Sequence, residues 1–233
     1  ERHLAMVAVK NQNAALLNEF AHLQQEISIE GILDSPEAMT NNPYVAEPLR
    51  FFDACPVSDG GAAVILASKE VAKSLGGPMI RLAGVGQATD THAVHEREEP
   101  TDLLAVRKAA AKSFEMAGVT PQDVDVAELH DAFTILEIVE SEEVGFFEKG
   151  KGHLALEEGV TGLGGALPIN VGGGLKGRGH PVGATGVAQA HEIVLQLRGQ
   201  AKQRQVADAA IGFTCNFGGF GNNVVCLTFV REE

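Results

Sequence analysis

Three short segments place reactive side chains directly after apolar stretches of the sequence. The segment 130–133 (HDAF) begins with His130 and follows residues 124–129 (VDVAEL), whose apolar residues alternate as in a strand. The glycine-rich segment 170–186 carries His180 directly before a proline, and a third segment begins at Cys215 and continues as NFGG. Histidine is the commonest general acid or base, and a cysteine among close backbone amides suits a thiolate or an oxyanion hole. The three segments together therefore predict acid–base chemistry at one site.

Each segment taken alone also has a plainer interpretation. A lone histidine at a strand end is commonly a structural group with satisfied hydrogen bonds. A glycine-rich stretch can be a turn or a phosphate cradle, although no GxxxxGK[ST] pattern is present and no convincing strand precedes a GxGxxG. Cys215 is equally suited to packing as a small apolar residue, and Cys226, within a valine-rich run, is interpreted as core. The remaining histidines lie in polar settings and are interpreted as solvated.

Composition excludes several classes of protein. The chain has 233 residues, 45% of them hydrophobic and 21% charged, with a formal net charge of -13. This acidic balance argues against partners that are nucleic acids or anionic membrane surfaces, because both need clusters of Lys and Arg. Three cysteines without a CxxC pattern are too few for a disulfide scaffold or a zinc site. We therefore expect no metal, no membrane span and a reducing, cytoplasmic location.

The elements that must position these groups alternate between helix and strand. Region 23–58 is irregular and interrupted by prolines, which indicates an excursion that packs on another part of the protein. Apolar periodicity and capping residues predict helices at 3–22, 68–75, 101–117, 132–147 and 187–198, and strands at 62–67, 79–87, 124–129, 207–214 and 223–230. This order is typical of a layered α/β domain with its reactive groups on loops at strand ends.

The three segments, taken together, resemble the C-terminal half of the thiolase superfamily, in its archaeal or sterol-carrier-protein-type form. Residues 170–186 are similar to the signature N-x-x-G-G-x-[apolar]-x-x-G-H-P-x-G-x-[ST]-G, with a departure at Lys176. HDAF at 130–133 is similar to the family's NEAF or HDxF loop, and CNFGGFG at 215–221 resembles CxGGGxG. Residues 55–63 (CPVSDGGAA) resemble the segment that re-enters the N-terminal domain. The resemblance covers essentially the whole chain.

The resemblance implies a role for each matching residue. His180 would be the base that activates a nucleophilic cysteine, Cys215 the second acid/base at the substrate α-carbon, and His130 part of the oxyanion hole. The substrate would be a coenzyme A thioester, with no tightly bound cofactor. An α-proton beside a thioester is weakly acidic, so its removal needs both a base and donors aimed at the enolate oxygen. Residues expected to contact the substrate or CoA are Phe133, Phe217, Gly218 and Cys55.

The resemblance also implies an α/β fold, a thiolase-like layered α/β/α sandwich, of which this chain is the C-terminal half with a piece of the N-terminal domain. Residues 1–58 would be the tail of a loop region, 59–78 the last strand and helix of the N-terminal domain, and 79–233 the C-terminal domain. The family's nucleophilic cysteine belongs to the absent half, and Cys55 aligns with no such position. Because the predicted strand 62–67 lacks partners in this chain, we expect an N-terminal half or complementary subunit, in a homo- or hetero-oligomer.

Besides lacking the nucleophilic cysteine, the chain departs from the family pattern at Phe217, and three functions are compatible with its sequence. Phe217 stands where the family has glycine, but the donor expected there is a backbone N–H, which any residue supplies. The leading function is an acyl-CoA C-acyltransferase that makes or cleaves 3-oxoacyl-CoA by Claisen chemistry. The alternative is a thiolase-like aldolase or acyl-CoA-processing subunit that works with an OB-fold partner protein. A third is a non-catalytic subunit that binds lipid or acyl carrier, although binding alone would not require His130, His180 and Cys215 together.

Overall fold

A four-stranded mixed sheet forms the centre of the molecule, as seen in the computed structural model, which describes residues 1–232. Its strands lie in the order β3-β6-β5-β4. The strands are β3 (Met79–Thr89), β4 (Val126–Glu128), β5 (Ile211–Gly218) and β6 (Asn223–Glu232). The β3–β6 and β6–β5 pairs are antiparallel, whereas β4 runs parallel to β5. The α/β fold expected from the sequence is confirmed.

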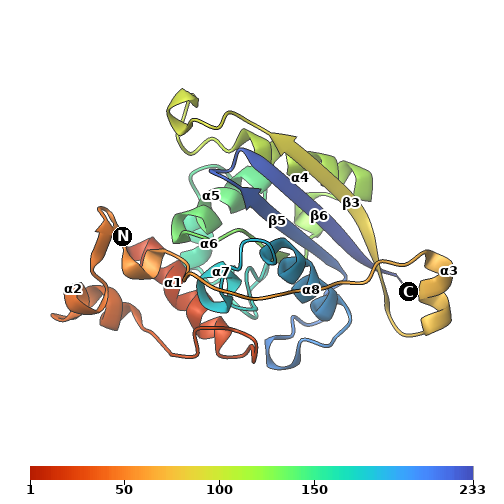
Figure 1. Cartoon of the computed structure of the whole chain (residues 1–233), viewed down its shortest axis with the longest axis horizontal. Helices are drawn as coiled ribbons and strands as arrows, with labels where there is room; N and C mark the ends of the chain where they lie inside the picture. Colours follow the sequence, from red (N-terminus) through yellow and green to blue (C-terminus); the bar gives the residue numbers. More distant parts are fainter. Residues whose placement is uncertain (233) are drawn as a thin grey trace.

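Helices cover both faces of this sheet (Figure 1). On one face, α4 and α5 pack over a core that includes Phe213 and Cys215 of β5. On the other face, α8 packs over a smaller core that includes Val126 and Phe229. The helices of the domain are α4 (Leu104–Ala117), α5 (Thr134–Val144), α6 (Gly152–Glu157), α7 (Gly174–Arg178) and α8 (Thr185–Leu197). None of the helices among residues 1–232 is both long and apolar enough to cross a lipid bilayer.

Two glycines let α4 lie directly on β3. A Cβ atom added at Gly84 or Gly86 would collide with the backbone carbonyl of Ser113 or Ala109 on α4. The strand therefore needs glycine at these positions for the helix to approach closely. Helix α4 ends where Gly118 adopts the left-handed conformation, φ 72°, as its sequence predicts.

The N-terminal region packs beside α5, α6 and α7 (Figure 1). It contains α1 (Arg2–Ala15), α2 (Ala38–Asn41), the short strands β1 (Tyr44–Ala46) and β2 (Leu49–Arg50), a π-helical turn at Glu30–Asp34 and a 3-10 turn at Phe51–Asp53. Helix α1 is shorter than predicted, because the chain bends after Ala15 and Asn18 then donates to the carbonyl of Gly172. The expected irregular excursion over 23–58 is confirmed in outline.

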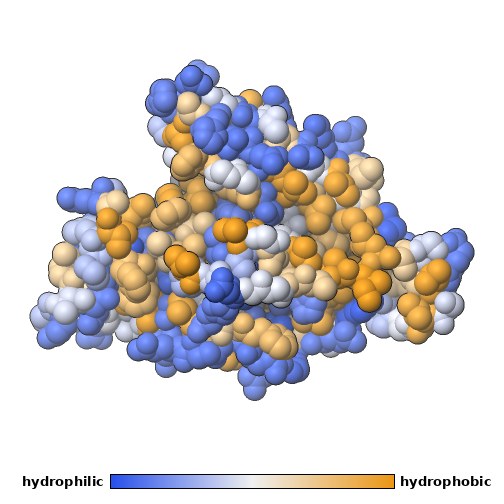
Figure 2. Space-filling model, in the orientation of Figure 1, coloured by the Kyte–Doolittle hydropathy of each residue, from blue (hydrophilic) through white to orange (hydrophobic). Residues whose placement is uncertain are grey.

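The strand predicted at 62–67 is wrong for this chain. These residues form no strand, and Ile65 is 94% exposed. These residues belong to an extended strap, residues 59–68, which crosses one face of the molecule and leads to α3 (Lys69–Leu75) (Figure 1). Apolar surface spreads across the same face (Figure 2). A strand needs a neighbouring strand to bond its backbone, and none is available here. Helix α3 forms as predicted, capped by Ser68, although none of its residues is buried.

Candidate active site

His130 lies in the short loop between β4 and α5, with 6% of its surface exposed. The backbone N–H of Phe217 donates to His130 Nδ1 at 3.3 Å, and Asn216 Nδ2 lies 3.2 Å from the same atom. Because a backbone N–H can only donate, Nδ1 is the unprotonated nitrogen and the ring proton is on Nε2. Burial, together with the nearby His180, lowers the pKa of His130 to about 3, so the ring is neutral at physiological pH. His130 is therefore a neutral donor through Nε2–H.

His180 has the opposite tautomer. Its Nδ1 lies 2.7 Å from the Thr185 hydroxyl, and this hydroxyl donates to the carbonyl of Pro181 at 3.0 Å. With its own proton given to the carbonyl, the hydroxyl accepts from His180 Nδ1–H, which leaves Nε2 with a free lone pair. Burial, and then the positive charge of Arg178, lower the pKa of His180 below its ordinary value. His180 is therefore a neutral ring whose Nε2 can accept a proton.

The two histidines meet edge to face. Their ring centroids lie 5.0 Å apart with an interplanar angle of 90°. One ring thus offers a hydrogen-bond donor and its neighbour a proton acceptor, which is the pair needed to remove a proton next to a carbonyl and stabilise the resulting enolate oxygen. The sequence predicted that both histidines belong to one site, and the structure brings them together.

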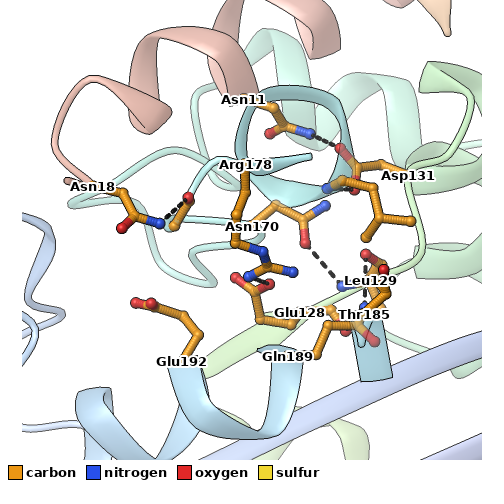
Figure 3. Close-up of polar contacts among 12 residues, drawn as sticks. Asn11, Asn18, Glu128, Leu129, Asp131, Asn170, Arg178, Thr185, Gln189 and Glu192 are labelled. Atoms are coloured by element: carbon orange, nitrogen blue, oxygen red, sulfur yellow. Dashed lines mark hydrogen bonds and ion pairs between the residues drawn. The ribbon is translucent and has the colours of Figure 1, made fainter. Parts of the chain in front are cut away.

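A buried polar network holds the two histidine loops against each other (Figure 3). Asp131, next to His130, accepts from the backbone N–H of Leu175 at 2.6 Å and from Asn11 Nδ2 at 2.7 Å. Burial raises the pKa of Asp131 to about 6, and the charge of Glu137 contributes. Because Leu175 lies on α7, just before His180, this carboxyl joins the loop of one histidine to the segment that leads to the other.

Asn170 makes a second connection between the same segments (Figure 3). Its Oδ1 accepts from the backbone N–H of Leu129 at 2.9 Å, and its Nδ2 donates to Glu137 at 2.7 Å. Asn170 itself is fully buried and has a positive φ of 59°. Leu129 directly precedes His130, so this asparagine fixes the main chain where the 130–133 loop begins.

A buried ion pair involves Arg178, which lies two residues before His180. Arg178 Nη1 lies 2.8 Å from Glu128 Oε2, and the carboxylate is fully buried at the end of β4. Burial raises the pKa of Glu128 to about 7, although the charge of Arg178 opposes this shift. Arg178 thereby links the strand that leads to His130 with the segment that carries His180.

Cys215 does not lie where the sequence predicts. It is not on a loop but within β5, which continues to Gly218, and it is completely buried. Its neighbour across the antiparallel ladder is Cys226, and both residues belong to the core under α4 and α5. Burial and the contact with Cys226 raise the pKa of the Cys215 thiol well above its ordinary value. The strand alternation thus directs this thiol into the α4–α5 layer, whereas α8 packs on the opposite face; its acid–base role stays a prediction.

Phe217 and Gly218 form the end of β5, beside His130. The Phe217 ring stacks on the His130 ring with centroids 5.2 Å apart and 11° between their planes. The backbone N–H of Phe217, expected as an oxyanion donor, instead donates to His130. Gly218 pairs with Asn223 at the start of β6. Their substrate contacts stay predictions, but Phe217 clearly orients the histidine.

Cys55 lies against the end of the 130–133 loop, close to Phe133. The backbone N–H of Cys55 donates to the carbonyl of Ala132 at 2.9 Å, and Ala54 forms an isolated antiparallel bridge with Phe133. Burial raises the pKa of the Cys55 thiol, and the charge of Asp131 adds to this effect. Phe133 is 42% exposed. Cys55 therefore borders the loop that carries His130, and Phe133 is the last residue of that loop; the contact of either residue with a substrate remains a prediction.

A cavity of about 330 Å³ opens on the other side of the 179–185 segment. Its walls include the strap residues 60–63, the start of α8 and the side chains of Arg178 and His191. Neither His130 nor Cys215 lines it. Thr185 borders this cavity and also holds His180.

Several residues of the site were not singled out from the sequence. Gln189 of α8 donates to the carbonyls of Leu129 and Cys215 and accepts from Asn216, so it fills the space between the His130 loop and β5. Asn11 comes from α1, far away in the sequence, and no local pattern marks it. Thr185 occupies the Ser/Thr position of the 170–186 signature, so a signal was available for this residue.

Several known proteins are similar to this chain. The family described as thiolase C-terminal domain-like matches residues 86–231, which is more than half of the chain. The chain belongs to the thiolase superfamily. It is 43% identical, over 98% of its length, to an acetyl-CoA acetyltransferase of Methanothermobacter thermautotrophicus, and 35% identical over 97% to human sterol carrier protein 2. Among solved structures, it is similar to the Ltp2-ChsH2(DUF35) aldolase with a TM-score of 0.85 and 24% identity over 99% of the chain.

The chain spans only part of these thiolase-superfamily proteins. It covers 58% of the acetyltransferase, 41% of sterol carrier protein 2 and 58% of the aldolase chain. The aldolase likeness shows the fold. The superfamily membership and the thiolase-like fold expected from the motifs are thus confirmed.

Proposed function

We propose that this chain is the C-terminal catalytic portion of an acyl-CoA C-acyltransferase that makes or cleaves 3-oxoacyl-CoA by Claisen chemistry. The observation that carries the proposal is the pair of opposite tautomers, His180 with a free Nε2 and His130 with a protonated Nε2, in contact at 5.0 Å. Two neutral imidazoles, one that accepts a proton and one that donates a hydrogen bond, suit a thioester substrate, because its α-proton is removed while its oxygen gains negative charge. The substrate would be a coenzyme A thioester, without a tightly bound cofactor.

In this mechanism, His180 Nε2 accepts a proton from the nucleophile or the substrate, and its Nδ1–H remains fixed on Thr185. His130 Nε2–H donates to the thioester oxygen as negative charge develops there. Its low pKa ensures that it stays neutral and does not compete with His180 for the proton. The nucleophilic cysteine of the acyltransferase would come from the N-terminal half of the protein or from a complementary subunit.

The exposed strap supports such a complement. Residues 59–68 offer an extended backbone, and the apolar side chains of Ile65 and Leu66 are 94% and 76% exposed. Large apolar side chains that are exposed at neighbouring positions are typical of a protein–protein interface. We propose that strap and α3 complete a sheet and helix of the N-terminal domain, in a homo- or hetero-oligomer. Hydrogen exchange at 62–67 should become at least about tenfold slower when the complementary polypeptide is present.

The second candidate is a thiolase-like aldolase or acyl-CoA-processing subunit with an OB-fold partner protein. The burial of Cys215 favours it, because a thiol enclosed in the core under α4 and α5 is poorly placed to exchange protons with a substrate. A retro-aldol cleavage needs a base and enolate stabilisation but no thioester-forming cysteine. Here His180 would remove the proton of a β-hydroxyl group and His130 would hold the enolate oxygen.

The products of the reaction decide between these candidates. The full-length protein is incubated with a 3-oxoacyl-CoA plus free CoA, and separately with a 3-hydroxyacyl-CoA. Formation of two acyl-CoA products supports the acyltransferase, and release of an aldehyde or ketone supports the aldolase. In either case, H180Q should lower kcat by about 10²–10⁴-fold and H130Q by about 10²–10³-fold. H153Q, on α6 and away from the site, is the control, and equal activity in all three variants would refute the proposal.

A further inference from the structure

Glu140 is a buried carboxyl that the mechanism above does not use. It lies on α5 and is completely buried. The other buried glutamates among residues 1–232 each pair with a lysine or arginine: Glu128 with Arg178, Glu137 with Lys10, Glu143 with Arg107 and Glu192 with Arg204. Glu140 has no such partner within ion-pair distance in that part of the chain. An unpaired buried carboxylate is very unfavourable, so this environment selects the neutral acid.

Two contacts connect Glu140 to the catalytic loop and to β5. Its Oε2 accepts from the backbone N–H of His130 at 2.9 Å. Its other oxygen, Oε1, is buried and has no hydrogen-bond partner among residues 1–232, while the Cys215 thiol is near enough to raise the pKa of this carboxyl. Because Oε2 already accepts, a proton on this carboxyl belongs on Oε1. Burial raises the pKa of Glu140 well above its ordinary range, and Cys215 and Asp131 contribute to the shift.

These contacts give His130 a two-point attachment to one strand. Its ring accepts from the Phe217 N–H, and its main chain donates to Glu140, which in turn contacts Cys215. Cys215 and Phe217 are two residues apart on β5 and therefore point to the same face of the sheet. Both the ring and the backbone of His130 are thus held relative to that face.

We propose that Glu140 is a positioning residue for His130: as an uncharged carboxylic acid, it holds the His130 backbone through Oε2 and directs its Oε1 proton to the Cys215 sulfur. Cys215 acts here as a buried support for the oxyanion donor. The effect on rate rests on the proposed function of His130, whereas the protonation state of Glu140 does not. No group is oxidised or transferred, since the proton stays on the carboxyl.

The protonation state is tested in the full-length protein by infrared difference spectroscopy at neutral pH. We expect E140Q to remove the C=O stretching band of a protonated carboxylic acid and to shift the S–H band of a buried cysteine. E143Q is the matched control, because Glu143 lies on the same helix, is buried and pairs with Arg107. It should remove only carboxylate bands. Loss of a carboxylate band in E140Q would overturn the proposal whether or not the protein turns over an acyl-CoA.

The positioning role is tested by rescue. Glutamine keeps an acceptor for the His130 N–H and a donor for the sulfur, so E140Q should retain kcat within about threefold and keep His130 in its Nε2–H tautomer, read from ¹⁵N chemical shifts. Methionine has similar volume but neither group, so E140M should lower kcat about tenfold or more with KM nearly unchanged, as expected for one lost hydrogen bond to the loop. An E140M protein with wild-type kcat and an unchanged His130 tautomer would overturn the role. If E140M does not fold, E140Q still decides, because a large loss of kcat in E140Q is equally contrary to the proposal.

Discussion

Replacement of Asn170 by alanine should loosen the loop that carries His130. In the native structure, Asn170 accepts from the Leu129 N–H at 2.9 Å and donates to Glu137 at 2.7 Å, and both bonds are buried. Alanine removes both, and it must also adopt the native φ of 59°. Glu137 keeps its ion pair with Lys10 and its bond from Asn11, whereas residues 1–232 offer the Leu129 N–H no acceptor other than Asn170.

The structure gives the magnitude of this loss. An unsatisfied buried N–H costs about 1–3 kcal/mol, and a hydrogen bond to a charged carboxylate contributes about 1.5–3 kcal/mol. A left-handed alanine costs about 1–2 kcal/mol more. The lower ends of these ranges apply, because Glu137 keeps other partners, so N170A should lower the free energy of unfolding by about 4 kcal/mol. Glycine avoids the left-handed cost but has more freedom when unfolded, so N170G should be about 0.5–1 kcal/mol more stable than N170A.

Urea unfolding monitored by circular dichroism measures these differences, and the ¹⁵N shifts of His130 report on the loop. N13A is the matched control, because Asn13 also makes two side-chain hydrogen bonds, both to the backbone of Ile27 in the N-terminal region. It should lower the free energy of unfolding by about 1–3 kcal/mol and leave the His130 signals in place. A loss below about 1 kcal/mol in N170A, or an N170G protein less stable than N170A, would refute this reasoning.

Three further predictions concern the base, the donor and the sheet. T185V removes the acceptor that orients His180 and should lower kcat about tenfold at constant KM, measured with the assay above. His130 has a pKa of about 3 in the folded protein and about 6.5 in the unfolded chain. The stability that it contributes is therefore fully present above about pH 6.5 and is lost as the pH falls toward 3. In H130Q, the free energy of unfolding measured with urea should vary less with pH between about pH 4 and 8. G86A should destabilise the protein by more than about 3 kcal/mol or prevent folding, because its Cβ would collide with the backbone of α4, whereas G183A, with open space around it, should unfold at nearly the wild-type urea concentration.

Local sequence signals determined much of the element order. Ser68 and Gly118 mark a helix start and a helix end through interactions within a few residues of the chain, so the sequence alone locates them. Apolar patterning likewise indicated the four strands of the central sheet and α8, with boundaries shifted by a few residues, but it did not indicate β1 and β2. The motifs at 130–133 and 170–186 identified both histidines, because each depends on residue types at fixed spacing.

The strand boundaries at β5 show where local signals fail. The NFGG sequence after Cys215 indicated a loop, yet β5 continues to Gly218 because β6 pairs with it as far as Asn223. Pairing with a distant strand supplied the hydrogen bonds that override the weak strand propensity of asparagine and glycine. The run 62–67 shows the reverse case, in which strong local apolarity forms no strand because no neighbour is present.

The chemistry of the two histidines was settled only by tertiary structure. The sequence fixes that two imidazoles are present, but their tautomers depend on the Phe217 N–H and on the Thr185 hydroxyl, and the first of these comes from a strand 87 residues away. Tertiary structure also decides the direction of the Cys215 thiol, because it depends on which face of β5 carries this side chain. Protonation and direction are set by which donors, acceptors and apolar groups surround a side chain, and the chain brings those together only when it folds.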